Sequence, residues 1–372
     1  MRWRLLTGLI ACCFSVPAVA LNQSYPVVYQ SPRALGMGGT DVAIGGDPDA
    51  LFSNPAGLGG MQPGWQTLPL VATVGSSRRS ESFIRDFRAA LDEDTPEEQR
   101  TELSDLVRNY RGRNLHADGN VVPNISWRGR EWAVSAAWLG TARFDGRTHQ
   151  GFGDQGLISL DARTLSGPVL GVAHQSGRWS TGVAVKTLRK RRVRETYSVR
   201  ELVELTEEGG DISDDVQSGH ASAMDVGIQY DLAPGYHWQP RVGAVIRNVG
   251  DLDFGGAGRI PQSVAAGIAV EPPASGTARI QLSAEYADLL HDLGDDSDHL
   301  KRLRLGGQWY LWERRRHALA LRAGLYQRAL TAGVDLRVQM LRIGLMTYAE
   351  EQGAFAGQDS DRRYVLTVGL GL

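Results

Sequence analysis

The sequence predicts an all-β chain that closes into a transmembrane antiparallel β-barrel of about fourteen strands. Three observations support this prediction. From Trp65 to the C-terminus, segment after segment alternates apolar and polar residues, the connections between segments alternate between short and long, and tryptophans gather beside the short ones. A soluble β-sandwich accounts for the first observation but for neither of the other two.

The N-terminal residues have the features of an export signal. Arg2 and Arg4 precede an apolar run, and a small-residue site ends at Ala20. We therefore predict a signal peptide over residues 1–20, cleaved after Ala20. The alternative is lipoprotein processing before Cys12, because the residues leading to Cys12 have the form of a lipoprotein box. Cleavage after Ala20 removes Cys12 and Cys13, and with them any disulfide or thiolate metal site.

Charge and hydropathy narrow the class of protein further. The chain has 40 basic and 42 acidic residues, and loss of the two signal arginines leaves a net charge of about −4, which gives no global attraction to nucleic acid. After the signal, no run approaches the roughly eighteen apolar residues of a membrane helix. The sequence thus excludes a helical membrane protein.

A glycine-rich segment follows the signal. The stretch SPRALGMGGTDVAIGGDPDALFSNPAGLGG, residues 31–60, has neither helical nor strand periodicity. It lacks a G-x-x-x-x-G-K-[ST] motif and follows no predicted strand, which argues against a nucleotide-binding loop. Glycine and proline allow a compact irregular backbone to approach a wall closely. We predict a periplasmic or lumenal hatch over 21–64, inside a barrel formed by 65–372.

The alternating segments give the predicted strands. They span 65–76, 115–128, 131–144, 155–175, 178–193, 218–232, 237–249, 260–271, 276–290, 299–312, 316–326, 329–337, 339–350 and 361–372. Connections after even-numbered strands are mostly short, and those after odd-numbered strands are mostly long and often acidic. This asymmetry is typical of outer-membrane barrels, whose short turns face the periplasm. The tryptophans beside short turns fit an interfacial girdle at that end: Trp127, Trp132, Trp179, Trp238 and Trp312.

One segment between the first two strands departs from the β pattern. Residues 81–112 carry apolar side chains at helical spacing, first from Phe83 and again from Leu103. Thr95-Pro96-Glu97-Glu98 has the form of an N-cap followed by a capping-box glutamate. These features predict a helical hairpin in the first extracellular loop, where it could cover the barrel mouth.

The segment RALGMGG...VAIGGDPDALFSNPAGL resembles the N-terminal hatch of FadL-type outer-membrane transporters for long-chain fatty acids and other hydrophobic compounds. Asn54, Pro55 and Ala56 match the Asn-Pro-Ala motif of that hatch, and Gly57 follows it. The helical insert and the C-terminal strands are similar to the PorV and conjugal-transfer TraF-like branch. The resemblance implies a hatch inside a fourteen-strand barrel, with these four residues as hatch or ligand positions. A turn that fixes the hatch is favoured over direct ligand contact.

Two groups of charges fall within predicted strands. We expect a lumenal network at Glu285, Arg304, Arg322, Asp335, Arg337 and Arg342. It either pairs across the lumen to hold wall and hatch together or binds an anionic head group, and pairing is favoured. A basic run places an outer-leaflet patch at Lys186, Arg189, Lys190, Arg191, Arg192 and Arg194. Lipopolysaccharide phosphates are its expected partner, with nucleic acid as the alternative.

No histidines have metal-ligand spacing, so we expect neither an enzyme nor a cofactor. The predicted function is passage of a hydrophobic small molecule across the bacterial outer membrane, released by a rearrangement of the hatch or by an opening in the wall. Gly140, in the third strand, is a candidate kink for such an opening. The alternative is a structural or assembly barrel of a secretion or conjugation system, which binds a protein partner through its extracellular loops.

Overall fold

The structure, a computed structural model, describes residues 25–371 apart from 151–155, 202, 204–215, 295 and 315. The predicted signal peptide, with Ala20 and Cys12, lies outside the described residues. No helix within them is long and apolar enough to cross a membrane.

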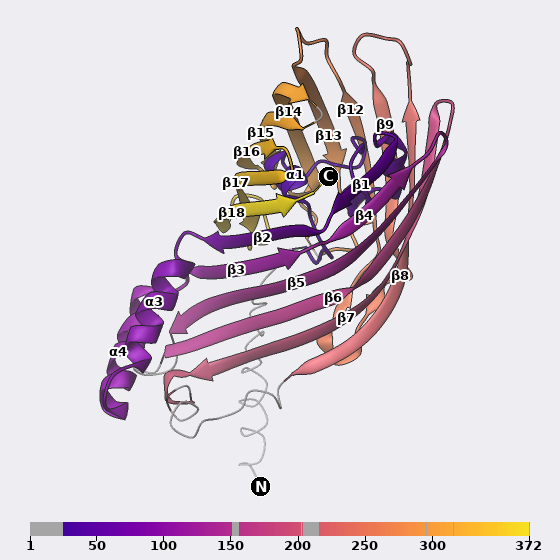
Figure 1. Cartoon of the computed structure of the whole chain (residues 1–372). Helices are drawn as coiled ribbons and strands as arrows, with labels where there is room; N and C mark the ends of the chain where they lie inside the picture. Colours follow the sequence, from indigo (N-terminus) through magenta and orange to yellow (C-terminus); the bar gives the residue numbers. More distant parts are fainter. Residues whose placement is uncertain are drawn as a thin grey trace.

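The strands form one antiparallel sheet that closes on itself. They are β1 (Gly64–Leu68), β2 (Leu70–Ser77), β3 (Asn114–Val121), β4 (Asn124–Arg128), β5 (Trp132–Gln150), β6 (Gly156–Ser176), β7 (Trp179–Ser198), β8 (Gln217–Asp231), β9 (Arg241–Val249), β12 (Ser263–Val270), β13 (Arg279–Tyr286), β14 (Leu303–Arg314), β15 (His317–Tyr326), β16 (Ala329–Val338), β17 (Leu341–Glu351) and β18 (Ser360–Leu370). Because β1–β2 and β3–β4 are halves of two interrupted strands, the sixteen segments make fourteen barrel strands. The predicted barrel is confirmed (Figure 1).

Two prolines interrupt these strands. Pro69 separates β1 from β2, and Pro123 separates β3 from β4. Proline has no N–H to donate to a neighbouring strand, so the hydrogen-bond ladder breaks there. The predicted kink at Gly140 is wrong, because β5 continues through Gly140, which pairs with Val121 on one side and Ser166 on the other. The irregularity lies in the neighbouring strand instead.

The outward and inward faces of the wall differ as the alternation predicts. Outward positions of β6, β7 and β16, such as Leu170, Val185 and Leu330, are at least half exposed. Inward positions carry buried polar and charged side chains, Glu285 and Asp335 among them. Near the short turns, exposed tryptophans ring the outer face: Trp65, Trp132, Trp179, Trp238 and Trp312.

Residues 25–63 lie inside the ring of strands and form the hatch (Figure 1). They contain α1 (Pro32–Gly36), α2 (Ala50–Ser53) and the 3-10 helix η1 (Pro55–Gly60). At five wall glycines that face the hatch, an added methyl group would overlap the hatch backbone or the Asn54 side chain: Gly182, Gly227, Gly243, Gly306 and Gly324. Glycine at these inward positions therefore lets hatch and wall approach closely.

The predicted helical hairpin is present as α3 (Ser80–Leu91) and α4 (Pro96–Asn109). The Thr95 hydroxyl accepts the N–H of Glu98 at 3.3 Å, as the capping pattern predicts.

The hairpin packs on the outside of the wall, against Leu115, Phe144 and Ile158. In the period-two alternation, Leu115 shares a face with exposed Val121, and Ile158 shares one with exposed Leu170. The expectation that the hairpin covers the mouth is therefore wrong. β5, β6 and β7 are 19, 21 and 20 residues long, whereas about 9–11 residues span a bilayer. The hairpin covers apolar residues on the parts of the wall strands that extend beyond the bilayer.

Candidate functional site: a lumenal cavity above the hatch

A cavity of about 520 Å³ lies in the lumen at the long-loop end. The N-terminal segment of the hatch, residues 26–30, lines one side of it. Its other aliphatic lining residues are Leu35, Leu165, Ile260, Leu293 and Ala354. We call this space the upper cavity. The sequence did not single out these positions.

The remaining wall of the upper cavity is charged. Six basic and four acidic side chains line it: Arg143, Arg163, Lys190, Arg192, Arg194 and Arg259, with Asp118, Asp161, Asp296 and Glu350. Several of these form ion pairs. Arg192 holds Asp161 through two nitrogens, at 2.9 and 2.6 Å, and Arg143 donates to Asp145 at 2.9 Å. The cavity therefore combines an apolar segment with an excess of positive charge.

Lys190 is a buried cation with no carboxylate partner among the described residues. Its side chain is only 6% exposed and lines the upper cavity. The ammonium nitrogen lies 5.5 Å from the centre of the Phe254 ring, and Lys190 forms no ion pair among the described residues. A buried, unpaired cation is unfavourable, so an anionic group bound beside it would gain a charge-assisted hydrogen bond.

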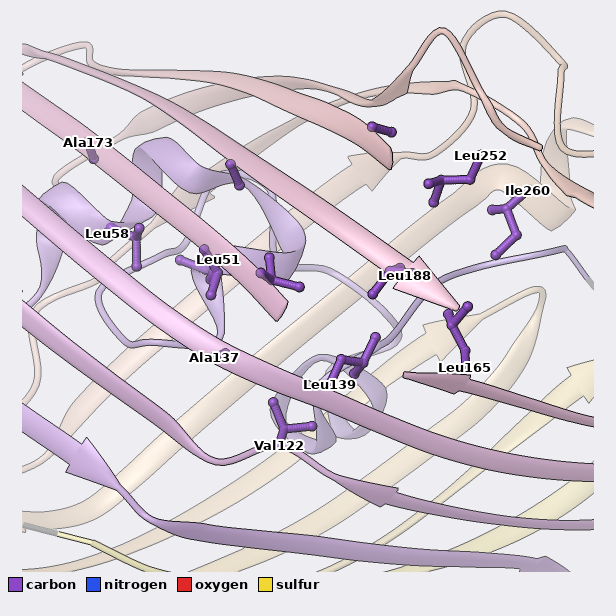
Figure 2. Close-up of a cluster of buried hydrophobic side chains, with 14 of the residues drawn as sticks. Leu51, Leu58, Val122, Ala137, Leu139, Leu165, Ala173, Leu188, Leu252 and Ile260 are labelled. Carbon is purple, nitrogen blue, oxygen red and sulfur yellow. The ribbon is translucent and has the colours of Figure 1, made fainter. Parts of the chain in front are cut away.

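A long loop folds inward over this cavity. It carries β10 (Leu252–Asp253), η3 (Gly255–Ala257) and β11 (Arg259–Ile260). Leu252 and Ile260 belong to the same apolar cluster as Leu188 and Leu165 of the wall (Figure 2). The cluster continues to Leu51 and Leu58 of the hatch, at the left of Figure 2. An apolar path thus follows β6 and β7 from the loop to the hatch.

The first described residue, Tyr25, is tied to the loop between β13 and β14. Its hydroxyl donates to Asp296 at 3.0 Å, and Lys301 and Arg302 lie 5.0 and 5.3 Å from its ring centre. Burial alone would raise the pKa of the Asp296 carboxyl, but hydrogen bonds from Arg302 and Lys301 outweigh burial and hold that pKa below its usual range. Asp296 therefore stays ionised at neutral pH and keeps its hydrogen bond with Tyr25. We call this contact the latch.

Another buried charge cluster joins β3 and β5 to the last two strands of the barrel, β17 and β18. The His116 ring contacts Asp145 at 2.7 Å through Nδ1 and Asp118 at 2.9 Å through Nε2. Arg363 of β18, 1% exposed, pairs with Asp361 at 3.0 Å and Glu350 at 3.2 Å, and lies 3.7 Å from Asp145. Both His116 nitrogens are occupied by carboxylates, so the ring has no free nitrogen to serve as a base for a serine.

Replacing Arg363 by methionine is expected to destabilise the barrel by about 3–5 kcal/mol, because buried carboxylates lose their cation. The temperature at which the compact band unfolds on a detergent gel should fall. Arg362→Met is the matched control, since Arg362 is only half-buried and, among the described residues, donates to the carbonyl of Leu330 and to no carboxylate. Equal unfolding temperatures for the two variants would contradict the assignment.

The predicted hatch tetrad lies below the upper cavity and does not line it. Asn54 is fully buried, donates to the carbonyl of Val42 at 2.8 Å and accepts the N–H of Ala56 at 3.1 Å. Pro55 occupies the first position of η1, and Gly57 follows within it. The Ser180 hydroxyl of the wall donates to the carbonyl of Ala56 at 2.6 Å. These contacts fix the hatch to the wall.

The predicted lumenal charges separate into three places. Glu285 accepts the N–H groups of Asp41 and Val42 at 2.9 and 3.0 Å, and Arg304 lies 3.5 Å from Glu285 and donates to the carbonyl of Gly39.

The other four residues divide between the wall and a short turn. Asp335 pairs with Arg342 at 2.9 Å and lies 3.7 Å from Arg322. Arg337 lies apart and donates to the carbonyl of Arg314 beside a short turn. Only Glu285 and Arg304 thus bind the hatch backbone directly.

The predicted outer-leaflet patch requires a correction. Lys186 and Lys190 are buried on the lumenal face of β7, and Lys186 pairs with Asp225 at 2.8 Å. Arg192 and Arg194 also line the upper cavity. Side chains alternate between the two faces of a strand, so a continuous basic run is divided between them. Only Arg189 and Arg191 remain on the outer face.

A second cavity, of about 360 Å³, lies at the short-turn end. The hatch residues Ala43 and Ile44 line it, together with the turn between β8 and β9. A smaller space of about 60 Å³ lies above, lined by Gly39 and Asp41. We call the larger space the lower cavity. Residues 39–44 of the hatch therefore separate the lumen from the short-turn end.

Within the described residues, no group of three histidine, cysteine or acidic side chains is placed to hold a metal ion.

Comparisons with known proteins bear on the fold. No protein-family model and no curated protein matches the sequence. Solved structures do match, with nearly complete coverage. They include the CymD monoaromatic hydrocarbon channel (TM-score 0.54, 11% identity, 94% of this chain and 98% of that chain), the Ralstonia pickettii toluene transporter TbuX (0.55, 12%, 92% and 97%) and the Pseudomonas putida toluene transporter TodX (0.54, 12%, 94% and 98%).

At such low identity these likenesses show the fold alone. The predicted resemblance to FadL-type transporters is confirmed at that level. The chain has the fourteen-strand, outer-membrane barrel fold of these hydrocarbon transporters.

Proposed function

We propose that the barrel passes a hydrophobic small molecule bearing an anionic group across the outer membrane. The observation that carries this proposal is unpaired Lys190, which lines a cavity that also has an apolar side formed by residues 26–30, Leu165 and Ile260. The apolar tail of such a ligand would lie along that side, and its head would meet Lys190. CymD is described as a hydrocarbon channel, and TbuX and TodX as toluene transporters, which supports the hydrophobic part of the assignment.

The proposed route runs down the lumen. A ligand in the upper cavity is separated from the lower cavity by residues 26–30 and 39–44. The backbone of residues 39–44 is held by side chains: Asn54 and Arg304 donate to its carbonyl groups, and Glu285 accepts its N–H groups. A concerted shift of these contacts would open the way to the lower cavity. An opening in the wall is the alternative route.

A disulfide between hatch and wall distinguishes the two routes. A Cβ at Gly59 would lie 3.5 Å from the Cβ of Ser180, which is within the range for a disulfide. Oxidised Gly59→Cys/Ser180→Cys protein should lose uptake of radiolabelled dodecanoate in cells without their own importer, and reduction should restore it. The single variants are the controls. Uptake that continues through the oxidised double variant would contradict the hatch route and support an opening in the wall.

The second candidate function, an assembly barrel that binds a protein, is favoured by the position of α3 and α4 on the outer face of the wall. Native mass spectrometry of the barrel extracted from outer membranes tests it. A retained small amphiphile supports transport, whereas a retained polypeptide and an empty cavity support assembly. The denatured mass in the same run tests the proposed cleavage after Ala20 against lipidation at Cys12.

A further inference from the structure

The two arginines that remain outside the barrel belong to a donor-rich surface on β6, β7 and β8. In the strand register, Arg189 lies between Ser166 and His220, and Arg191 lies between Thr164 and Ser218. The side chains of both arginines are exposed. These six residues form two rows across β6, β7 and β8, and we call them the outward basic patch. Every member offers hydrogen-bond donors, and no acidic side chain occupies either row.

The arginines of this patch are unpaired. Neither Arg189 nor Arg191 forms an ion pair among the described residues. In the next row toward the short turns, the hydroxyls of Thr187 and Ser222 hydrogen-bond at 3.0 Å, which extends the polar surface. Below this row the outer face becomes apolar, with Val185 50% exposed. The patch thus stands at the upper edge of the apolar band.

The height of the patch agrees with the boundary of the outer leaflet. Trp179 marks the lower edge of the band on β7, and Arg189 follows ten residues later. Ten residues of strand span about 33 Å. At a tilt of about 40° this rise corresponds to about 25 Å, the usual height of the apolar band of an outer-membrane barrel. Arg189 therefore lies where lipid tails give way to head groups.

We propose that the outward basic patch binds the phosphate groups of the lipopolysaccharide lipid anchor. The guanidinium groups of Arg189 and Arg191 would form charge-assisted, forked hydrogen bonds to phosphate oxygens. His220 and the neighbouring hydroxyls would supply further donors. The patch faces away from the lumen, so this proposal does not rest on the transport function.

The test is a titration of the purified, lipid-free barrel with rough lipopolysaccharide, measured by native mass spectrometry. Arg189→Gln/Arg191→Gln protein is expected to bind at least tenfold more weakly than the wild type. The matched control, Arg130→Gln/Arg178→Gln, removes two exposed arginines at short turns and should bind normally. Unfolding temperatures on a detergent gel establish that all three proteins are folded.

Removal of the phosphates from the lipopolysaccharide should weaken wild-type binding to the same degree. Equal binding by the outward double variant and the wild type would overturn the proposal, as would equal binding of the dephosphorylated lipid. Displacement of the lipid by millimolar inorganic phosphate would instead indicate a site for a small anion and would also overturn it. Dodecanoate uptake by the outward double variant should be unchanged, which separates this test from that of the transport function.

Discussion

Replacing Gly306 by alanine is expected to expel the hatch from the lumen while the barrel remains closed. A methyl group at Gly306 would overlap the carbonyl oxygen of Met37 and would lie 2.6 Å from the Thr40 hydroxyl. Met37 and Thr40 are fully buried, and a backbone carbonyl cannot rotate away as a flexible side chain can. Around Gly306 the ladders on both sides of β14 are unbroken from Leu305 to Tyr310, so we expect the hatch to move rather than the wall.

Conductance in planar bilayers measures this effect. The wild type should be nearly closed, and Gly306→Ala should conduct at least tenfold more. Gly140→Ala is the matched control, because its methyl group would meet only the carbonyl of Val121 at 3.5 Å. If Gly306→Ala remained as closed as the wild type, the hatch would not depend on this close approach.

Replacing Lys190 by glutamine should weaken the binding of an amphiphilic carboxylate by roughly ten- to a hundredfold, the equivalent of one hydrogen bond to a charged group. The unfolding temperature should stay the same or rise, because the substitution removes a buried cation that has no carboxylate partner. This combination distinguishes a ligand-binding lysine from a structural one, whose loss would lower stability.

Dodecanoate and dodecan-1-ol, titrated by calorimetry, provide the measurement. The wild type should prefer the carboxylate, and Lys190→Gln should lose that preference. Arg189→Gln is the control, since Arg189 is adjacent in sequence but faces outward. Equal affinity of the wild type for the two probes would contradict an anion site.

The barrel could be predicted from the sequence because period-two alternation and turn length are local properties. The same alternation, applied to residues 186–194, places the side chains of Lys186, Lys190 and Arg192 on the inward face. Net charge alone makes the basic run one patch, whereas strand geometry divides it between two faces. Similarly, Leu115 and Phe144 face outward on parts of their strands that extend beyond the bilayer. Apolar side chains in that position indicate that another element of the chain packs on them.

The upper cavity could not be predicted in the same way. It depends on the latch between Tyr25 and Asp296, which are 271 residues apart. It also depends on the inward folding of the loop that carries Phe254. Both are long-range contacts with no local pattern. Asn54 was found through a resemblance, but its part in holding Val42 becomes visible only once the hatch lies against the wall.

Binding of an amphiphilic anion in the upper cavity can be observed in a crystal structure with 12-bromododecanoate, in which anomalous scattering locates the bromine. The carboxylate is expected within hydrogen-bond distance of Lys190, and the bromine against the apolar side of the upper cavity, beside Val27, Leu165 or Ile260. Bromine only on the outer wall, or a carboxylate remote from Lys190, would contradict this expectation.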